Sequence, residues 1–202
     1  MESFEDKLKR VLAEEVALAP YDPEWPRAFR EEKARLLACL PGELIRRIEH
    51  MGSTAVPGLA AKPIVDMLVE VTDLDETRER IAPVLEARGY DYFWRPSHGD
   101  DVPPFYAWFI RRDPRTGART HHIHMVEADF AEHWQRLLFR DYLIAHPEVA
   151  AEYADLKHRL ATDHPNDRVA YTEGKTAFII DVTGRAKRHF GEDPTGGGRH
   201  DV

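Results

Sequence analysis

Residues 64–71 (IVDMLVEV) are the stretch that most constrains the fold of this chain. They are apolar except for Asp66 and Glu70, a pattern typical of a strand covered on both faces. An ionised carboxylate in such a strand is destabilising unless it is paired or binds a metal. Two alternatives follow for Asp66: an ion pair with a base such as Lys62 or Lys175, or a metal site. Glu70 lies about 13 Å further along the same face, too far to share a metal with Asp66.

The remaining periodicity predicts strands first and helices last. Expected strands cover residues 44–51, 64–71, 90–94, 105–112 and 119–127, of which the last two form an antiparallel pair joined by DPRTGA. Expected helices cover residues 26–40, 73–88, 129–145, 147–163 and 168–189, with an amphipathic helix in the first dozen residues and a loop over 95–104. This order predicts an α+β fold, a mixed β-sheet core with flanking helices and a helical C-terminal extension. Residues 1–190 are expected to form a single domain, and residues 191–202 a disordered, glycine-rich tail.

Composition narrows the function classes. The chain has 28 Lys and Arg against 36 Asp and Glu, and this net charge of −8 argues against a general nucleic-acid binder. The sequence has no run of about 18 apolar residues, so no membrane span is predicted. The single cysteine, Cys39, cannot form an intramolecular disulfide or a cysteine-rich zinc site. The first 20 residues lack the pattern of a signal peptide, so a cytoplasmic location is expected.

Gly52 and Ser53 follow the predicted strand 44–51, at a turn that leads towards a helix start. Backbone N–H groups and a hydroxyl converge on anions at such turns. The alternative is a turn glycine followed by a serine N-cap, which is a common local structure.

The run HHIH at residues 121–124 lies in a predicted strand, so His122 and His124 share one face and His121 lies on the other. Two imidazoles at this spacing are able to bind a metal, but a dedicated zinc site needs three or four ligands. They also fit a solvated strand, or hydrogen bonds to a phosphate or carboxylate.

Lys175, in YTEGKTAFI, and Arg140, in FRDYL, are the other candidate site residues. Each is able to neutralise a phosphate, and the alternative for both is an ordinary surface ion pair.

Several long motifs, taken together, resemble the GrpB family, also called UPF0157. They are PYDPEWP, IEHMGSTAVPGLAAKPIVDMLVEV, RTHHIHMVE, FRDYLIAHPEVAAEYADLK and AYTEGKTAFI, in order between residues 17 and 182. The resemblance implies membership of the nucleotidyltransferase superfamily. Its pattern has a Gly-Ser pair that holds triphosphate oxygens and two carboxylates, one residue apart, that hold a divalent metal. Gly52, Ser53 and Asp66 match this pattern, whereas Leu68 occupies the position of the second carboxylate.

The leucine is a serious departure, because clustered carboxylates usually hold Mg²⁺ in nucleotidyl transfer. His122 or His124 would replace the missing ligand if their strand lies beside residues 64–71, and would favour Mn²⁺ or Zn²⁺ over Mg²⁺. This hypothesis requires at least one imidazole within about 6 Å of the Asp66 carboxylate, since a shared metal spans no more than that.

The resemblance implies a metal-dependent nucleotidyltransferase that transfers NMP from an NTP to a small-molecule or protein acceptor. Asp66 would bind Mg²⁺ or Mn²⁺ with His122 and His124, Lys175 would act with Asp66 in catalysis, and Gly52, Ser53, Lys62 and Arg140 would bind phosphate.

The competing hypothesis is a non-catalytic nucleotide-binding, anion-binding or interaction module on the same scaffold, which loss of the second carboxylate favours. The family also occurs fused to some dephospho-CoA kinases, which fits both. A weaker third hypothesis is a metal-dependent hydrolase that uses the histidines. A nucleotide or another phosphate-containing small molecule is the expected ligand, a protein partner stays open, and nucleic acid and membrane are not expected.

Overall fold

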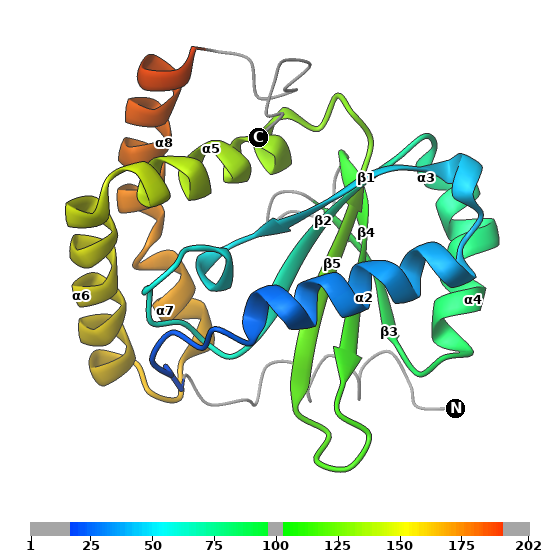
Figure 1. Ribbon diagram of the computed structural model, residues 1–202, viewed down its shortest axis with the longest axis horizontal. Coiled ribbons are helices and arrows are strands. Elements are labelled where there is room, and N and C mark those ends of the chain that lie inside the picture. The colour runs from blue at the N-terminus through cyan, green and yellow to red at the C-terminus, as the bar shows by residue number, and fades with distance from the viewer. Residues whose placement is uncertain (1–16, 97–102, 192–202) are drawn as a thin grey trace.

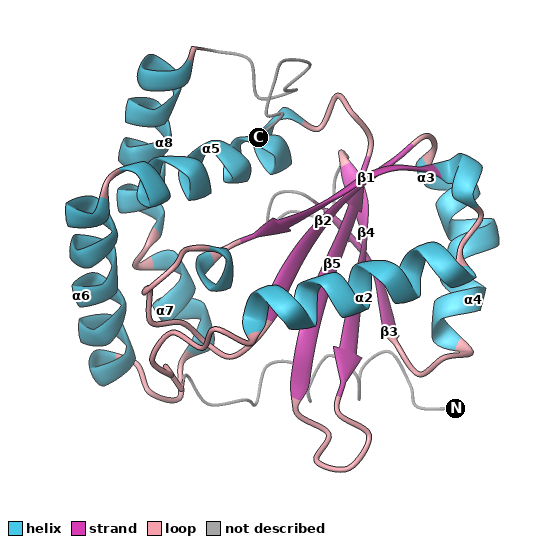
Figure 2. Ribbon diagram, in the orientation of Figure 1, coloured by secondary structure: helices cyan, strands magenta, loops and turns pink. Residues whose placement is uncertain are grey.

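The computed structural model describes residues 17–96 and 103–191 (Figures 1 and 2). The predicted N-terminal helix, most of the 95–104 loop and the tail from residue 192 lie outside these residues. In the described part of the chain, every helix is too short or too polar to cross a membrane.

A five-stranded mixed sheet forms the centre of the fold. Its strands lie in the order β1 (Ile45–Met51), β2 (Val65–Val71), β5 (Arg119–Val126), β4 (Phe105–Arg112) and β3 (Asp91–Pro96). β2 and β5 are parallel and all other neighbours are antiparallel. The α+β class, the mixed sheet and the antiparallel pair β4–β5 are therefore as predicted from the sequence.

Both faces of β2 are buried, as its apolar run predicts. Val65, Met67 and Val69 are at most 2% exposed and point to one face, in a core shared with helix α2 (Trp25–Cys39). We call this the α2 face. Leu68 is fully buried on the other face, in a core shared with Trp134 of helix α5 (Ala131–Ala145), and we call that the α5 face.

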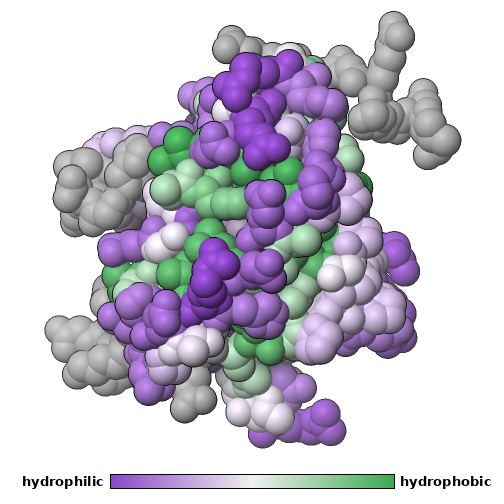
Figure 3. Space-filling view, turned by 90° about the vertical axis from the view of Figure 1, so that its left-hand side faces the viewer, coloured by the Kyte–Doolittle hydropathy of each residue, from purple (hydrophilic) through white to green (hydrophobic). Residues whose placement is uncertain are grey.

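The helices form two groups on either side of the sheet (Figure 1). α2 crosses the strands, and α3 (Leu74–Glu76), the π-turn Thr77–Ile81 and α4 (Ala82–Glu86) lie towards β3. On the opposite side, α5 is joined by α6 (Pro147–Asp163), α7 (Arg168–Glu173) and α8 (Thr176–Phe190). Viewed from this side, hydrophilic surface surrounds apolar patches (Figure 3), and the exposed large apolar residues of α5, α7 and α8 are Ile144, Val169, Ile180 and Phe190.

Two predicted elements have other bounds than expected, and one predicted helix contains an irregular turn. The expected helix 168–189 is two helices, because Gly174 allows the end of α7 to pack on Leu160 so closely that a Cβ there would lie 2.5 Å from its side chain. The expected helix 73–88 forms over residues 74–86 but includes the π-turn, and Pro83 lies in the first turn of α4, where its missing N–H is tolerated. β3 continues through Pro96 because β4 pairs with it that far, so the loop begins later than predicted.

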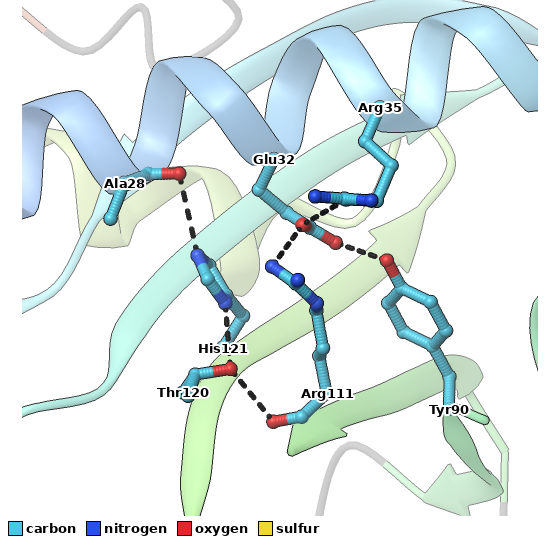
Figure 4. A network of polar contacts seen from close by, with 7 residues as sticks. All are labelled: Ala28, Glu32, Arg35, Tyr90, Arg111, Thr120 and His121. Carbon is cyan, nitrogen blue, oxygen red and sulfur yellow. Dashed lines mark hydrogen bonds and ion pairs between the residues drawn. The ribbon is translucent and has the colours of Figure 1, made fainter. Parts of the chain in front are cut away.

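The α2 face also contains a buried carboxylate that the sequence pattern did not indicate. Glu32 of α2 is fully buried, accepts a hydrogen bond from the Tyr90 hydroxyl and pairs with Arg111 at 2.7 Å and Arg35 at 3.3 Å (Figure 4). Next to it, His121 lies 3.4 Å from the carbonyl oxygen of Ala28 (Figure 4). The network connects α2 to Tyr90, directly before β3, and to Arg111 of β4, and it satisfies the charge of Glu32.

Candidate functional site

The parallel pairing of β2 with β5 brings one carboxylate and two imidazoles together on the α5 face. Asp66 is in register with His122, and Leu68 with His124, so the side chains of each pair point the same way. Asp66, His122 and His124 each offer a potential ligand atom, and these atoms lie within 4.8 Å of one another. The proximity that the metal hypothesis requires is therefore present, and His124 lies beside the position of the missing second carboxylate.

A hydrogen bond joins Asp66 and His122. Nδ1 of His122 lies 3.0 Å from Oδ1 of Asp66, and the two side chains are 10% and 31% exposed respectively. Burial by itself raises the pKa of Asp66, but the hydrogen bond to His122 and the electrostatic interactions with His122, Arg136 and Lys62 outweigh it, so the pKa lies below its usual value. Asp66 does not form the alternative ion pair with Lys62 or Lys175. Among the described residues, its partner within 4.0 Å is His122.

The two imidazoles keep nitrogens that no protein group satisfies. Nε2 of His122 and Nδ1 of His124 are buried and have no hydrogen-bond partner in the described chain. Burial lowers the pKa of both histidines, and that of His124 falls well below its usual value. Both are therefore neutral near pH 7, the form that binds metal ions.

The Gly52–Ser53 turn lies against this cluster. Gly52 follows β1 with φ 73°, and a Cβ on it would lie 2.7 Å from Oδ2 of Asp66. Only glycine allows the backbone to approach the carboxylate so closely. Ser53 begins a short 3₁₀ turn whose N-terminus is not capped by any side chain, so the serine-cap alternative is wrong. The Ser53 side chain instead forms a hydrogen bond with Tyr153 of α6.

Lys62 and Lys175 meet around one aromatic ring. Their Nζ atoms lie 4.7 Å and 4.4 Å from the centre of the Tyr171 ring, and neither forms an ion pair within the described residues. Burial, and then the charges of Arg168 and Lys175, lower the pKa of Lys62 to about 7. Burial also lowers the pKa of Lys175 to about 8, although Asp66 opposes the shift. The loop before β2 and the start of α8 thus bring two lysines without ion-pair partners in the described chain to the side of Asp66.

Arg140 is held by other groups. It donates to the carbonyl oxygen of His50 at 2.7 Å, pairs with Asp141 at 2.7 Å and lies 3.5 Å from Glu49. Arg136, one turn earlier on α5, is exposed and has no ion-pair partner in the described residues, and its charge acts on Asp66 and His124. A phosphate role for Arg140 stays a prediction.

Three residues of this region were not singled out from the sequence: Tyr171, Arg136 and His133. Arg136 had a usable signal, because it precedes Arg140 by four residues and such residues share a helix face. His133 and Tyr171 had none, since a single histidine or tyrosine in a helix usually packs in the core.

Comparisons with known proteins agree with this architecture. The GrpB protein family matches residues 15–185. A UPF0157 protein of Pseudomonas aeruginosa is 41% identical over 174 residues, which cover 85% of this chain and 67% of that protein. The UPF0157 protein YqkA of Bacillus subtilis is 39% identical over 173 residues, which cover 86% of this chain but only 48% of that protein.

The crystal structure of the conserved protein GrpB from Enterococcus faecalis has the same fold. It superposes with a TM-score of 0.74 at 33% sequence identity, over 87% of this chain and 100% of that one. The family match thus covers both the strands that carry Asp66, His122 and His124 and the helices that carry Lys175. On these grounds, the chain belongs to the GrpB family.

Proposed function

We propose that this protein is a metal-dependent nucleotidyltransferase that binds a nucleoside triphosphate at the α5 face and transfers its NMP group to a hydroxyl of a small-molecule or protein acceptor. The observation that carries the proposal is the meeting of Asp66, His122 and His124 within 4.8 Å, beside the Gly52–Ser53 turn. A carboxylate, a glycine turn and unpaired lysines in one place are what a bound metal and its polyphosphate ligand require.

The residues fit a divalent metal. Three protein ligands leave coordination positions open, as catalytic metal sites do, and the unsatisfied buried nitrogens of His122 and His124 are suitable donors. One carboxylate and two imidazoles favour Mn²⁺ or Zn²⁺ over Mg²⁺. A cation held there would offset phosphate charge and polarise the α-phosphate.

The lysines supply the complementary site for phosphate. Lys62 and Lys175 lie around Tyr171 without carboxylate partners in the described chain, so an anionic ligand is able to compensate their charge. Ser53 and the backbone beyond Gly52 would bind further phosphate oxygens.

In the reaction, the acceptor hydroxyl oxygen attacks the α-phosphorus in line. A new oxygen–phosphorus bond forms as the bond to the β-phosphate breaks, pyrophosphate leaves with the bonding electrons, and the hydroxyl proton passes to water. Lys175 would neutralise charge that develops on the leaving group.

The test is a thermal-shift panel of ATP, GTP, CTP and UTP, each with and without Mg²⁺ or Mn²⁺. Ligand at about 100 times its Kd should stabilise the protein by roughly 2.7 kcal/mol. We expect a metal-dependent shift with one nucleotide, lost in Asp66→Asn. Glu70→Gln is the matched control, because Glu70 lies on the same strand and face but pairs with Arg47 at 2.9 Å. Equal shifts in the parent and Asp66→Asn would contradict the proposal.

The second candidate is a non-catalytic anion-binding module, and Leu68 at the second carboxylate position is the observation that favours it. This candidate predicts a shift with nucleotide or pyrophosphate that needs no metal and is lost in Lys62→Met. The hydrolase hypothesis predicts product release that depends on His122 and His124 but not on Ser53.

A further inference from the structure

Helix α6 presents two buried polar side chains to the segment between β1 and β2. Tyr153 and Lys157 are four residues apart on the helix, so they share one face, and they are 4% and 2% exposed. Neither has a role in the function proposed above. The hydroxyl of Tyr153 forms a hydrogen bond with the side chain of Ser53, and Nζ of Lys157 donates to the carbonyl oxygen of Ala60. One face of α6 therefore contacts both ends of residues 53–60.

The backbone of this segment is also held by other contacts. Val56 and Leu59 are each 2% exposed and pack in the apolar core that α5, α6 and α8 share. Directly after the segment, Ala61 exchanges two backbone hydrogen bonds with Ala19, at 2.8 Å and 3.0 Å. Because these contacts fix the backbone, the bond from α6 chiefly determines the direction in which the Ser53 hydroxyl points.

The chemistry of the two hydroxyls decides which one donates. A tyrosine hydroxyl is much more acidic than a serine hydroxyl, so it is the better donor in a bond between the two. Burial raises the pKa of Tyr153, and the charge of Asp66 adds to the shift, so the phenol keeps its proton at neutral pH. Ser53 is then the acceptor, and its own O–H is able to donate to another group. Ser53 is half-buried and lies beside Gly52 and Asp66, where a phosphate oxygen would accept this bond.

The ring of Tyr153 is fixed by contacts that do not involve its hydroxyl. Phe178 stacks on it and Phe139 lies edge-on, each with its ring centre 5.2 Å away. Nζ of Lys157 lies 4.8 Å from the centre of the ring. Removing the hydroxyl alone should therefore leave the ring and the helix in place.

We propose that Tyr153 is a positioning residue of the phosphate site, which donates to Ser53 and so directs the serine O–H towards a phosphate oxygen of the bound nucleotide. The proposal deepens the proposed function and rests on its phosphate site, but not on its metal. The ordinary alternative is a buried tyrosine that uses Ser53 only to satisfy its own hydroxyl. That role stabilises the fold and has no effect on anion affinity.

The experiment titrates inorganic tripolyphosphate into the protein by calorimetry near pH 7 in EDTA, so that no metal contributes. We expect Ser53→Ala to weaken binding about tenfold, the effect of one hydrogen bond to a charged group. Tyr153→Phe should weaken it about threefold, because a hydroxyl that is no longer held has three staggered orientations, of which one suits the phosphate. The double variant should bind like Ser53→Ala alone, because Tyr153 acts through Ser53.

Tyr142→Phe is the matched control. Tyr142 lies in the same apolar core, but its hydroxyl bonds to Arg185 of α8 and not to residues 53–60. This variant should bind tripolyphosphate like the parent, even if it melts at a lower temperature. Melting temperatures without ligand check that each variant is folded. Tyr153→Met, which also lacks the hydroxyl, is the second variant if Tyr153→Phe does not fold.

The outcomes separate this inference from the function on which it rests. If Ser53→Ala weakens binding but Tyr153→Phe binds like the parent, or if the two effects add in the double variant, Tyr153 does not act through Ser53 and the inference is wrong. If Ser53→Ala binds like the parent and Lys62→Met does not, the inference is wrong but the phosphate site stands. If the parent itself does not bind tripolyphosphate, the proposed phosphate site is wrong as well.

Discussion

The two faces of the sheet bury charged groups in opposite ways. On the α2 face, Glu32 is fully buried and is satisfied by Tyr90, Arg111 and Arg35 (Figure 4). On the α5 face, the partner of Asp66 among the described residues is His122, whose other nitrogen is buried and has no partner there. Both faces lie on the same five strands, so the contrast arises from the side chains and not from the fold.

The difference teaches how to separate a structural buried charge from a binding site. A carboxylate with several protein donors has its burial compensated within the fold. A cluster with unmet nitrogens and unpaired lysines is compensated only when a ligand arrives. The comparison predicts that mutations on the α2 face reduce stability, whereas mutations on the α5 face reduce ligand binding.

The largest effect on stability is expected for Glu32→Ala. Removing one partner of a buried ion pair leaves the other charge uncompensated, and we expect a loss of about 3 kcal/mol in the free energy of unfolding. Urea denaturation measures it. Metal affinity should not change, because Glu32 lies on the opposite face of the sheet from Asp66.

Glu31→Ala is the matched control. Glu31 neighbours Glu32 on α2, but its side chain is 63% exposed and lies 3.7 Å from Arg27, so the substitution should change stability by less than about 0.5 kcal/mol. Equal losses in the two variants would break the comparison, because the Glu32 network would then contribute no more than a surface pair.

A smaller effect, on both stability and binding, is expected for Gly52→Ala. The backbone at Gly52, with φ 73° and ψ −172°, is essentially restricted to glycine, and forcing alanine into it costs of order 1–3 kcal/mol. The new Cβ would also lie only 2.7 Å from Oδ2 of Asp66 and would push this oxygen away, so metal affinity should fall as well.

Gly58→Ala separates the two effects. Gly58 also has a positive φ, of 78°, but a Cβ there would meet nothing within 4 Å. The strain should reduce stability and leave metal affinity unchanged. If Gly52→Ala also binds metal like the parent, the close approach to Asp66 has no functional role.

Much of the fold could be predicted because it depends on local patterns. The apolar run around Asp66 and the alternating runs 105–112 and 119–127 identify strands, and the α6 boundaries at Pro147 and Asp163 follow from the His-Pro steps. The break at Gly174 could not be predicted, because it depends on the contact with Leu160, a residue of another helix.

The candidate site could be predicted only in part. The spacing of His122 and His124 places them on one face, but that they lie beside Asp66 depends on the parallel pairing of β2 with β5, a long-range contact. Glu32 was missed for the same reason, because its partners Tyr90 and Arg111 lie far along the chain. A buried charge is visible in the sequence only when its own element is otherwise apolar.

The last prediction is a pH dependence from the lysines beside Asp66. The pKa of Lys62 is about 7 and that of Lys175 about 8, against an ordinary value of 10.5, so between about pH 7 and 10.5 the unfolded chain binds more protons than the folded one. The contribution of these lysines to stability therefore rises with pH across this window. Anion binding should change in the opposite direction, because it needs the protonated form.

Melting temperatures from pH 6.5 to 10, with and without inorganic tripolyphosphate, test both trends. We expect the ligand-free melting temperature of the parent to rise relative to that of Lys62→Met as pH increases, and the tripolyphosphate shift to shrink above about pH 8. Lys187→Met, in the last turn of α8, is the control and should follow the parent. A tripolyphosphate shift that persists at pH 10 and in Lys62→Met would show that the anion binds elsewhere. In that case the lysines of the α5 face would not bind the ligand, and only the metal cluster would still distinguish this face from the α2 face.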